Sequence, residues 1–63
     1  MRLLSCVEVG KILFGIEKNL SEHAYRKRAI RLIYSENLPM KKIAGKWLIS
    51  VRRFNYWLDQ REI

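Results

Sequence analysis

The chain has 63 residues, 49% of them hydrophobic, which allows one small core and leaves no room for a second domain. Thirteen lysines and arginines against six acidic residues give a net charge of +7, so the expected partners are polyanions. One cysteine excludes an internal disulfide, and no Cys/His cluster suggests a metal site. No uncharged run approaches the roughly 20 residues that cross a bilayer, so we expect a cytoplasmic protein that does not enter a membrane.

The charge is uneven along the chain. Residues 1–20 carry a net charge of +1, from three basic and two acidic residues, and residues 21–63 carry +6, from ten basic and four acidic residues. The basic part therefore coincides with the segments that are interpreted below as a DNA-binding unit.

The first predicted element is a helix over about residues 5–19. Ser5 and Glu8 have the spacing of a capping box, in which each side chain accepts a hydrogen bond from the other residue's backbone N–H. Apolar residues then recur at helical spacing, namely Cys6, Val9, Ile12, Leu13, Ile16 and Leu20. This helix would cover the core of the remaining chain or form the seam of a dimer.

A second, supporting helix is predicted over about residues 21–36. Ser21 is a suitable N-cap, Glu22 is favourable in the first turn, and Asn37 tolerates the left-handed conformation that ends many helices. The predicted inner face consists of Tyr25, Ala29, Leu32 and Ile33. The other sides carry Arg26, Lys27, Arg28 and Arg31.

Residues 38–61 are predicted to form a helix-turn-helix. The first helix would run over 39–47, the turn would be 48–49, and Ser50 would cap a second helix over about 51–61. The inward faces are assigned to Ile43, Ala44 and Trp47 on the first helix and to Phe54, Trp57 and Leu58 on the second. The small Ala44 would allow a close helix crossing. The predicted fold is therefore all-α, a small four-helix bundle with a C-terminal helix-turn-helix, in one domain.

Two resemblances accompany this interpretation. The stretch IAGKWLISVRRFNYWL resembles the first helix-turn-helix of AraC-type regulators. The longer stretch YRKRAIRLIYSENLPMKKIAGKWLISVRRFNYWL is similar to the homeodomain-like unit of insertion-sequence transposases. The similarity covers about the last two thirds of the chain, and it implies a second helix that lies in the major groove of DNA.

The predicted DNA contacts follow from that docking. Arginine and asparagine bind guanine and adenine through two atoms each, and an apolar side chain can touch the methyl group of thymine. The predicted base-contacting residues are Val51, Arg52, Asn55 and Tyr56. The predicted phosphate-contacting residues are Lys41, Lys42, Lys46, Ser50 and Arg53.

The function expected from the sequence is that of a small sequence-specific transcriptional regulator. It would bind double-stranded DNA as a homodimer on a two-fold operator, and its short length suggests a phage or mobile-element product. The alternative is a protein-binding modulator that docks on a host regulator or polymerase subunit through its seven aromatic residues. No cofactor or metal is expected, and the absence of a catalytic constellation argues against an enzyme.

Overall fold

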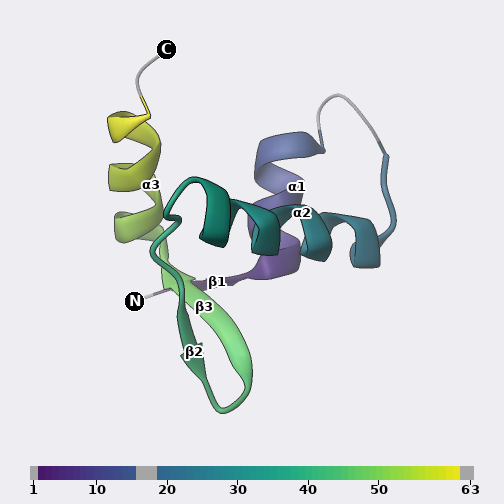
Figure 1. The fold of residues 1–63 in the computed structure, drawn as a ribbon, viewed down its shortest axis with the longest axis horizontal. Helices are drawn as coiled ribbons and strands as arrows, with labels where there is room; N and C mark the ends of the chain where they lie inside the picture. The colour runs from purple at the N-terminus through teal and green to yellow at the C-terminus, as the bar shows by residue number, and fades with distance from the viewer. Residues whose placement is uncertain (1, 16–18, 62–63) are drawn as a thin grey trace.

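The computed structural model describes residues 2–15 and 19–61. Three helices and a three-stranded antiparallel sheet make up this part of the chain (Figure 1). In chain order they are β1 (Leu3–Ser5), α1 (Cys6–Phe14), α2 (Glu22–Ser35), β2 (Lys41–Ile43), β3 (Lys46–Ser50) and α3 (Val51–Gln60). The fold is mixed α/β, so the prediction of an all-α four-helix bundle with a C-terminal helix-turn-helix is wrong.

A β-hairpin occupies the place of the helix predicted over 39–47. Strands β2 and β3 pair antiparallel and are joined by Ala44 and Gly45, whose φ angles are 51° and 79°. Two consecutive residues with positive φ make the type I′ turn that matches the twist of a two-residue hairpin. Continuing a helix through Gly45 would instead cost about 1 kcal/mol relative to alanine. Ile43 and Ala44, which were assigned to a buried helix face, are exposed.

The short strand β1 was not predicted from the sequence. It pairs with β3, so β3 lies at the centre of the sheet in the order β1-β3-β2. Leu4 lies opposite Ile49, and both side chains are 3% exposed. The predicted turn at 48–49 is therefore also wrong, because these residues lie inside a strand that gains partners on both edges.

The N-terminal boundaries of the helices agree with the sequence. The capping box of α1 is present: the Glu8 N–H donates to Ser5 Oγ at 3.2 Å, and the Ser5 N–H donates to Glu8 Oε1 at 2.9 Å. Ser21 accepts from the Ala24 N–H at 3.2 Å, and Ser50 accepts from the Arg53 N–H at 3.1 Å. These short polar side chains satisfy N–H groups that have no partner within the helix.

The C-terminal boundaries agree in part. Helix α2 ends just before Asn37, which has a φ of 57°, as the sequence predicted. Helix α1 ends at Phe14, earlier than the predicted residue 19. Part of that predicted extension, residues 16–18, lies outside the described residues.

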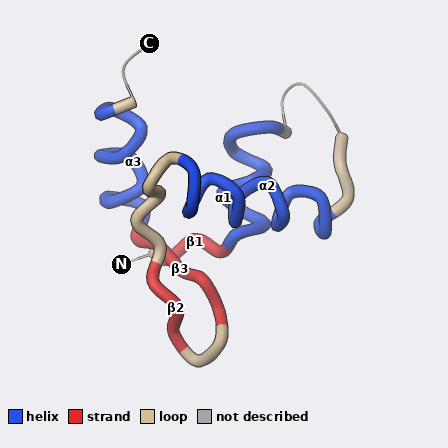
Figure 2. Tube along the Cα trace, in the orientation of Figure 1, coloured by secondary structure: helices blue, strands red, loops and turns tan. Residues whose placement is uncertain are grey.

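The core lies where the sheet meets all three helices (Figure 2). Its most buried side chains include Leu4, Cys6, Val9, Ala29, Leu38, Met40, Ile49, Phe54 and Trp57. The rings of Phe54 and Trp57 stack with centroids 6.1 Å apart, and Trp57 Nε1 donates to the Glu36 carbonyl at 3.1 Å. The prediction that Phe54 and Trp57 face inward is confirmed, and this contact attaches α3 to the end of α2.

Candidate nucleic-acid interface

Helices α1 and α2 form a closely packed pair, joined by residues 15–21. A Cβ atom added to Gly10 would lie 2.5 Å from the Tyr25 carbonyl oxygen, so the two backbones almost touch where the helices cross. Tyr25 is 4% exposed, and its hydroxyl accepts a hydrogen bond from the Leu20 N–H at 3.1 Å. This packing buries one side of α2 and leaves the opposite side free along its length (Figure 1).

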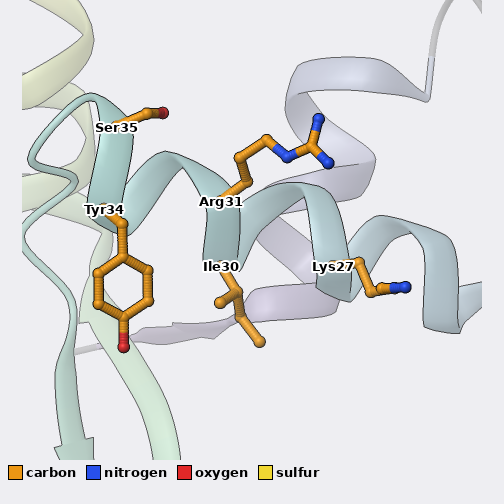
Figure 3. A pocket seen from close by; sticks show the side chains of 5 residues that line it. All are labelled: Lys27, Ile30, Arg31, Tyr34 and Ser35. Carbon is orange, nitrogen blue, oxygen red and sulfur yellow. The ribbon is translucent and has the colours of Figure 1, made fainter.

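The free side of α2 carries cationic and aromatic groups at helical spacing. Lys27, Arg31 and Tyr34 are exposed, and Tyr34 is 75% exposed. Because residues four and seven apart share one face of a helix, these three residues form a single row, from which the Tyr34 and Arg31 side chains extend to opposite sides (Figure 3). Together with Ile30 and Ser35 they line an open hollow of about 580 Å³ (Figure 3).

A second groove of about 450 Å³ lies on the other flank of α2, beside the end of α1. Its lining includes Phe14, Arg28, Lys27 and Arg31. The Arg28 guanidinium carbon lies 5.2 Å from the centroid of the Phe14 ring, a cation–π distance that holds this arginine against α1. Lys27 and Arg31 line both hollows and so stand on the ridge between them.

The β2–β3 hairpin supplies a second basic element. It projects from the body of the molecule, toward the side of α2 on which Ile30 and Tyr34 point (Figures 1 and 3). Lys41, Lys42 and Lys46 are all exposed on it. The Lys42 ammonium lies 5.7 Å from the centroid of the Trp47 ring, which orients this lysine over the strand pair.

Few of these cations are neutralised within the described chain. Among residues 2–15 and 19–61, ion pairs join Arg2 to Glu8 at 3.1 Å and Glu36 to Arg61 at 3.6 Å. Neither pair includes a residue of the row on α2 or a hairpin lysine. Those cations remain available to an anionic partner.

The predicted base-contacting residues lie on α3. Arg52, Asn55 and Tyr56 are exposed, whereas Val51 is half-buried against the core. Arg52 and Tyr56 share a hollow of about 500 Å³ with Ser50 and Arg53. The structure thus brings most of these residues together, but the element directly before α3 is the strand β3 and not the helix that a helix-turn-helix requires.

The predicted phosphate-contacting residues are divided between two places. Lys41, Lys42 and Lys46 lie on the hairpin, not on a helix, and Ser50 and Arg53 lie at the start of α3. The Ser50 hydroxyl oxygen is engaged as the cap of α3. Sequence reasoning placed Lys27 and Arg31 on the outer sides of this helix but did not join them with Tyr34 in one row, although the spacing of four and then three residues was visible in the sequence.

The buried cysteine Cys6 has a structural role. Burial raises the pKa of the Cys6 thiol, an effect that the nearby charge of Arg26 opposes, and Cys6 Sγ lies 3.9 Å from Met40 Sδ in the core. Cys6 therefore behaves as a small buried side chain and not as a nucleophile. The part of the chain that the structure describes contains no group of three or more metal-ligating side chains.

The same described residues contain no helix long and apolar enough to span a membrane. Comparison of the chain with protein-family models, with curated proteins and with solved structures gives no match. The function is therefore inferred from the geometry of α2 and the hairpin.

Proposed function

We propose that this protein is a small sequence-specific regulator that binds double-stranded DNA. The helix pair α1–α2 would dock on the duplex with α2 in the major groove, and the hairpin would lie as a wing against the neighbouring backbone. The observation that carries the proposal is the exposed row on α2, whose cations Lys27 and Arg31 have no ion-pair partner among the described residues and lie in line with Tyr34. The hairpin, which follows α2 in the chain, adds three exposed lysines.

The dimensions of α2 suit this role. A helix with its side chains fits the width of the major groove, where each base pair presents a distinct pattern of donors and acceptors. Lys27 and Arg31 are four residues apart, or about 6 Å along the helix axis. That distance spans roughly two base steps of 3.4 Å, so the two cations would reach positions about two base pairs apart. Arginine binds guanine O6 and N7 through two donors, which assigns Arg31 the more specific contact.

The hairpin lysines would supply affinity and register. Lys41, Lys42 and Lys46 are exposed on a projecting element and are free of described carboxylates. Lysine ammonium groups that neutralise phosphates release counterions, which strengthens binding without reading sequence. A basic helix beside a basic hairpin therefore suits a duplex: the helix can enter the groove while the hairpin contacts the phosphate backbone along its edge.

Helix α3 is the competing candidate for the reading helix. It carries the predicted base contacts Arg52 and Asn55, and both are exposed. Its preceding segment is β3, however, and its inner face is held by the core through Phe54 and Trp57. The helix packed against a partner helix is α2, and this favours α2 as the element that enters the groove.

Selection of bound sequences from a random duplex pool, followed by titration of the selected duplex, tests the proposal. Two variants with equal charge loss discriminate the helices: K27A/R31A on α2 and R52A/R53A on α3. If α2 reads bases, K27A/R31A loses about five- to 150-fold in affinity per base contact and also loses its preference for the selected duplex. R52A/R53A then weakens binding to every sequence alike, as removal of phosphate contacts does.

The opposite result would contradict the proposal. Sequence preference that survives in K27A/R31A and disappears in R52A/R53A would assign the reading role to α3. Equal affinity of the wild-type chain for selected and random duplexes would remove the sequence-specific regulator and leave non-specific DNA binding.

Two copies on a two-fold site remain part of the proposal, because one helix reads only a few base pairs. The apolar stripe of α1, which was a predicted dimer seam, is largely used inside the chain: Cys6 and Val9 are buried, and Gly10 meets Tyr25. Ile12 remains 49% exposed. Selected sequences with paired half-sites one helical turn apart would support a dimer, and single half-sites would support a monomer.

A protein-binding modulator is the second candidate. Leu3, Ile43 and Tyr56 are 46%, 51% and 66% exposed, and none of them lies on α2. Leu3 and Ile43 line a small groove of about 150 Å³ beside Lys41 and Arg53. This function would be favoured by a stoichiometric protein partner whose binding survives nuclease treatment. The L3S/I43S variant should no longer bind that partner, and the K27A/R31A variant should still bind it.

A further inference from the structure

We infer that the hollow on α2 is a recognition pocket for the C5-methyl group of a pyrimidine in the major groove, beside the base that Arg31 contacts. This inference rests on the proposed function and specifies what the α2 surface reads. The observation behind it is an apolar spot on an exposed face of α2 that also carries two cations (Figure 3).

The side chains that form this spot are Ile30 and Tyr34. They lie four residues apart, so they are neighbours on the helix surface. Figure 3 shows both pointing to the same side of α2, whereas Arg31 extends to the opposite side and Lys27 toward the start of the helix. Ile30 is half-buried and forms a firm floor, and the 75%-exposed Tyr34 forms a wall.

A partner that covers this surface needs an apolar group against the exposed ring and the half-buried isoleucine, and anionic groups near the cations. Duplex DNA meets both needs at once. Its phosphates are anionic, and the methyl group at C5 of thymine is the apolar feature that the major groove displays. 5-Methylcytosine displays a methyl group at the same ring position. The hollow therefore suits a methylated pyrimidine next to a base that accepts hydrogen bonds from the Arg31 guanidinium group.

Replacing thymine by uracil tests the pocket, because only the methyl group is removed and the hydrogen-bonding edges are unchanged. The probe is the selected duplex with uracil in place of thymine at one position at a time. At the contacted position we expect wild-type affinity to fall about fourfold, the value of burying one methyl group. Other positions should show no comparable change.

Two tyrosine variants form a matched pair for this measurement. Tyr34 and Tyr56 are both strongly exposed, at 75% and 66%, so neither substitution threatens the core. In Tyr34→Ala the affinity ratio between thymine and uracil duplexes should fall toward one. In Tyr56→Ala it should stay about fourfold. Circular dichroism confirms that both variants remain folded.

A further arm distinguishes the two sources of the methyl group. Cytosine and then 5-methylcytosine are placed at the sensitive position, opposite guanine. Tighter binding of the methylated base extends the pocket to both pyrimidines, whereas equal binding of the two limits it to thymine.

The inference fails if every uracil duplex binds as tightly as its thymine counterpart while K27A/R31A still loses affinity. It also fails if Tyr34→Ala and Tyr56→Ala keep the same uracil penalty. Both results would leave the proposed function in place. Absence of duplex binding by the wild-type chain would overturn the proposed function and the pocket together.

Discussion

Gly10 lies at the crossing of α1 and α2, and replacing it with alanine sets two effects of opposite sign against each other. In an isolated helix, glycine to alanine stabilises by about 1 kcal/mol, because alanine has less backbone freedom to lose. At this crossing the new Cβ would lie 2.5 Å from the Tyr25 carbonyl oxygen and 2.7 Å from Tyr25 Cβ. Neither atom can rotate away, so the helices must separate.

The steric effect should dominate. Forcing an extra methyl group into a packed contact costs about 1–3 kcal/mol, and a contact with backbone and Cβ atoms belongs to the upper part of that range. After the propensity gain, Gly10→Ala should lose about 1–2 kcal/mol of unfolding free energy. In a chain of this size that corresponds to a fall in melting temperature of about 5–15 °C.

Urea unfolding followed by circular dichroism measures this difference, and thermal melts provide a second estimate. Lys11→Ala is the control: it changes an exposed residue of the same helix and should stay within about 0.5 kcal/mol of wild type. A Gly10→Ala protein that is more stable than wild type would refute the reasoning. It would mean that α1 and α2 do not cross here, and the helix pair on which the DNA-binding proposal depends would lose its support.

Three further results are expected. Ala44→Asn should stabilise the hairpin by about 0.5–1 kcal/mol in urea unfolding, because asparagine tolerates positive φ better than alanine; a loss would contradict the type I′ turn. Hydrogen bonds from the Ser5 N–H and from Arg2 lower the pKa of Glu8 in the folded chain. These bonds therefore stabilise the fold fully above the pKa of an unfolded glutamate, about 4.3, and the stabilisation is lost as the pH falls through the lower pKa that Glu8 has in the folded chain. Melts from neutral to acidic pH should therefore show a smaller acid loss for Glu8→Gln than for wild type, and parallel curves would disprove it. Lys46→Ala should lower the slope of log affinity against log salt by about 1 for all duplexes, and an unchanged slope would remove this lysine from the phosphate contacts.

Local sequence was sufficient for the helix starts and for the last helix. Ser5, Ser21 and Ser50 each cap a helix through a hydrogen bond three residues away, and such contacts depend on nothing outside the segment. The inward face of α3 follows in the same way, because Phe54 and Trp57 are three residues apart and so lie on one side of this ten-residue helix.

The segment between Pro39 and Ser50 was assigned wrongly because its local pattern fits two structures. Ile43, Ala44 and Trp47 have helical spacing, but Trp47 and Ile49 also alternate as strand residues do. The sheet adds a long-range contact that favours the strand, because Leu4 lies opposite Ile49. A strand pairing across so many residues leaves no trace in a short window of sequence.

What the sequence alone determined about this protein is its charge, its single small core and the positions of its helix caps, because these depend on composition and on contacts a few residues apart. Tertiary structure alone decided which basic residues share a surface. Helical spacing already placed Lys27 and Arg31 off the inner face of α2, but the packing of α1 on α2 at Gly10 decided which part of the remaining surface stays uncovered. The pairing of β1 with β3 belongs to a sheet that stands where a helix was predicted. The free face of a helix is the one its neighbours leave uncovered, and those neighbours are set by long-range contacts.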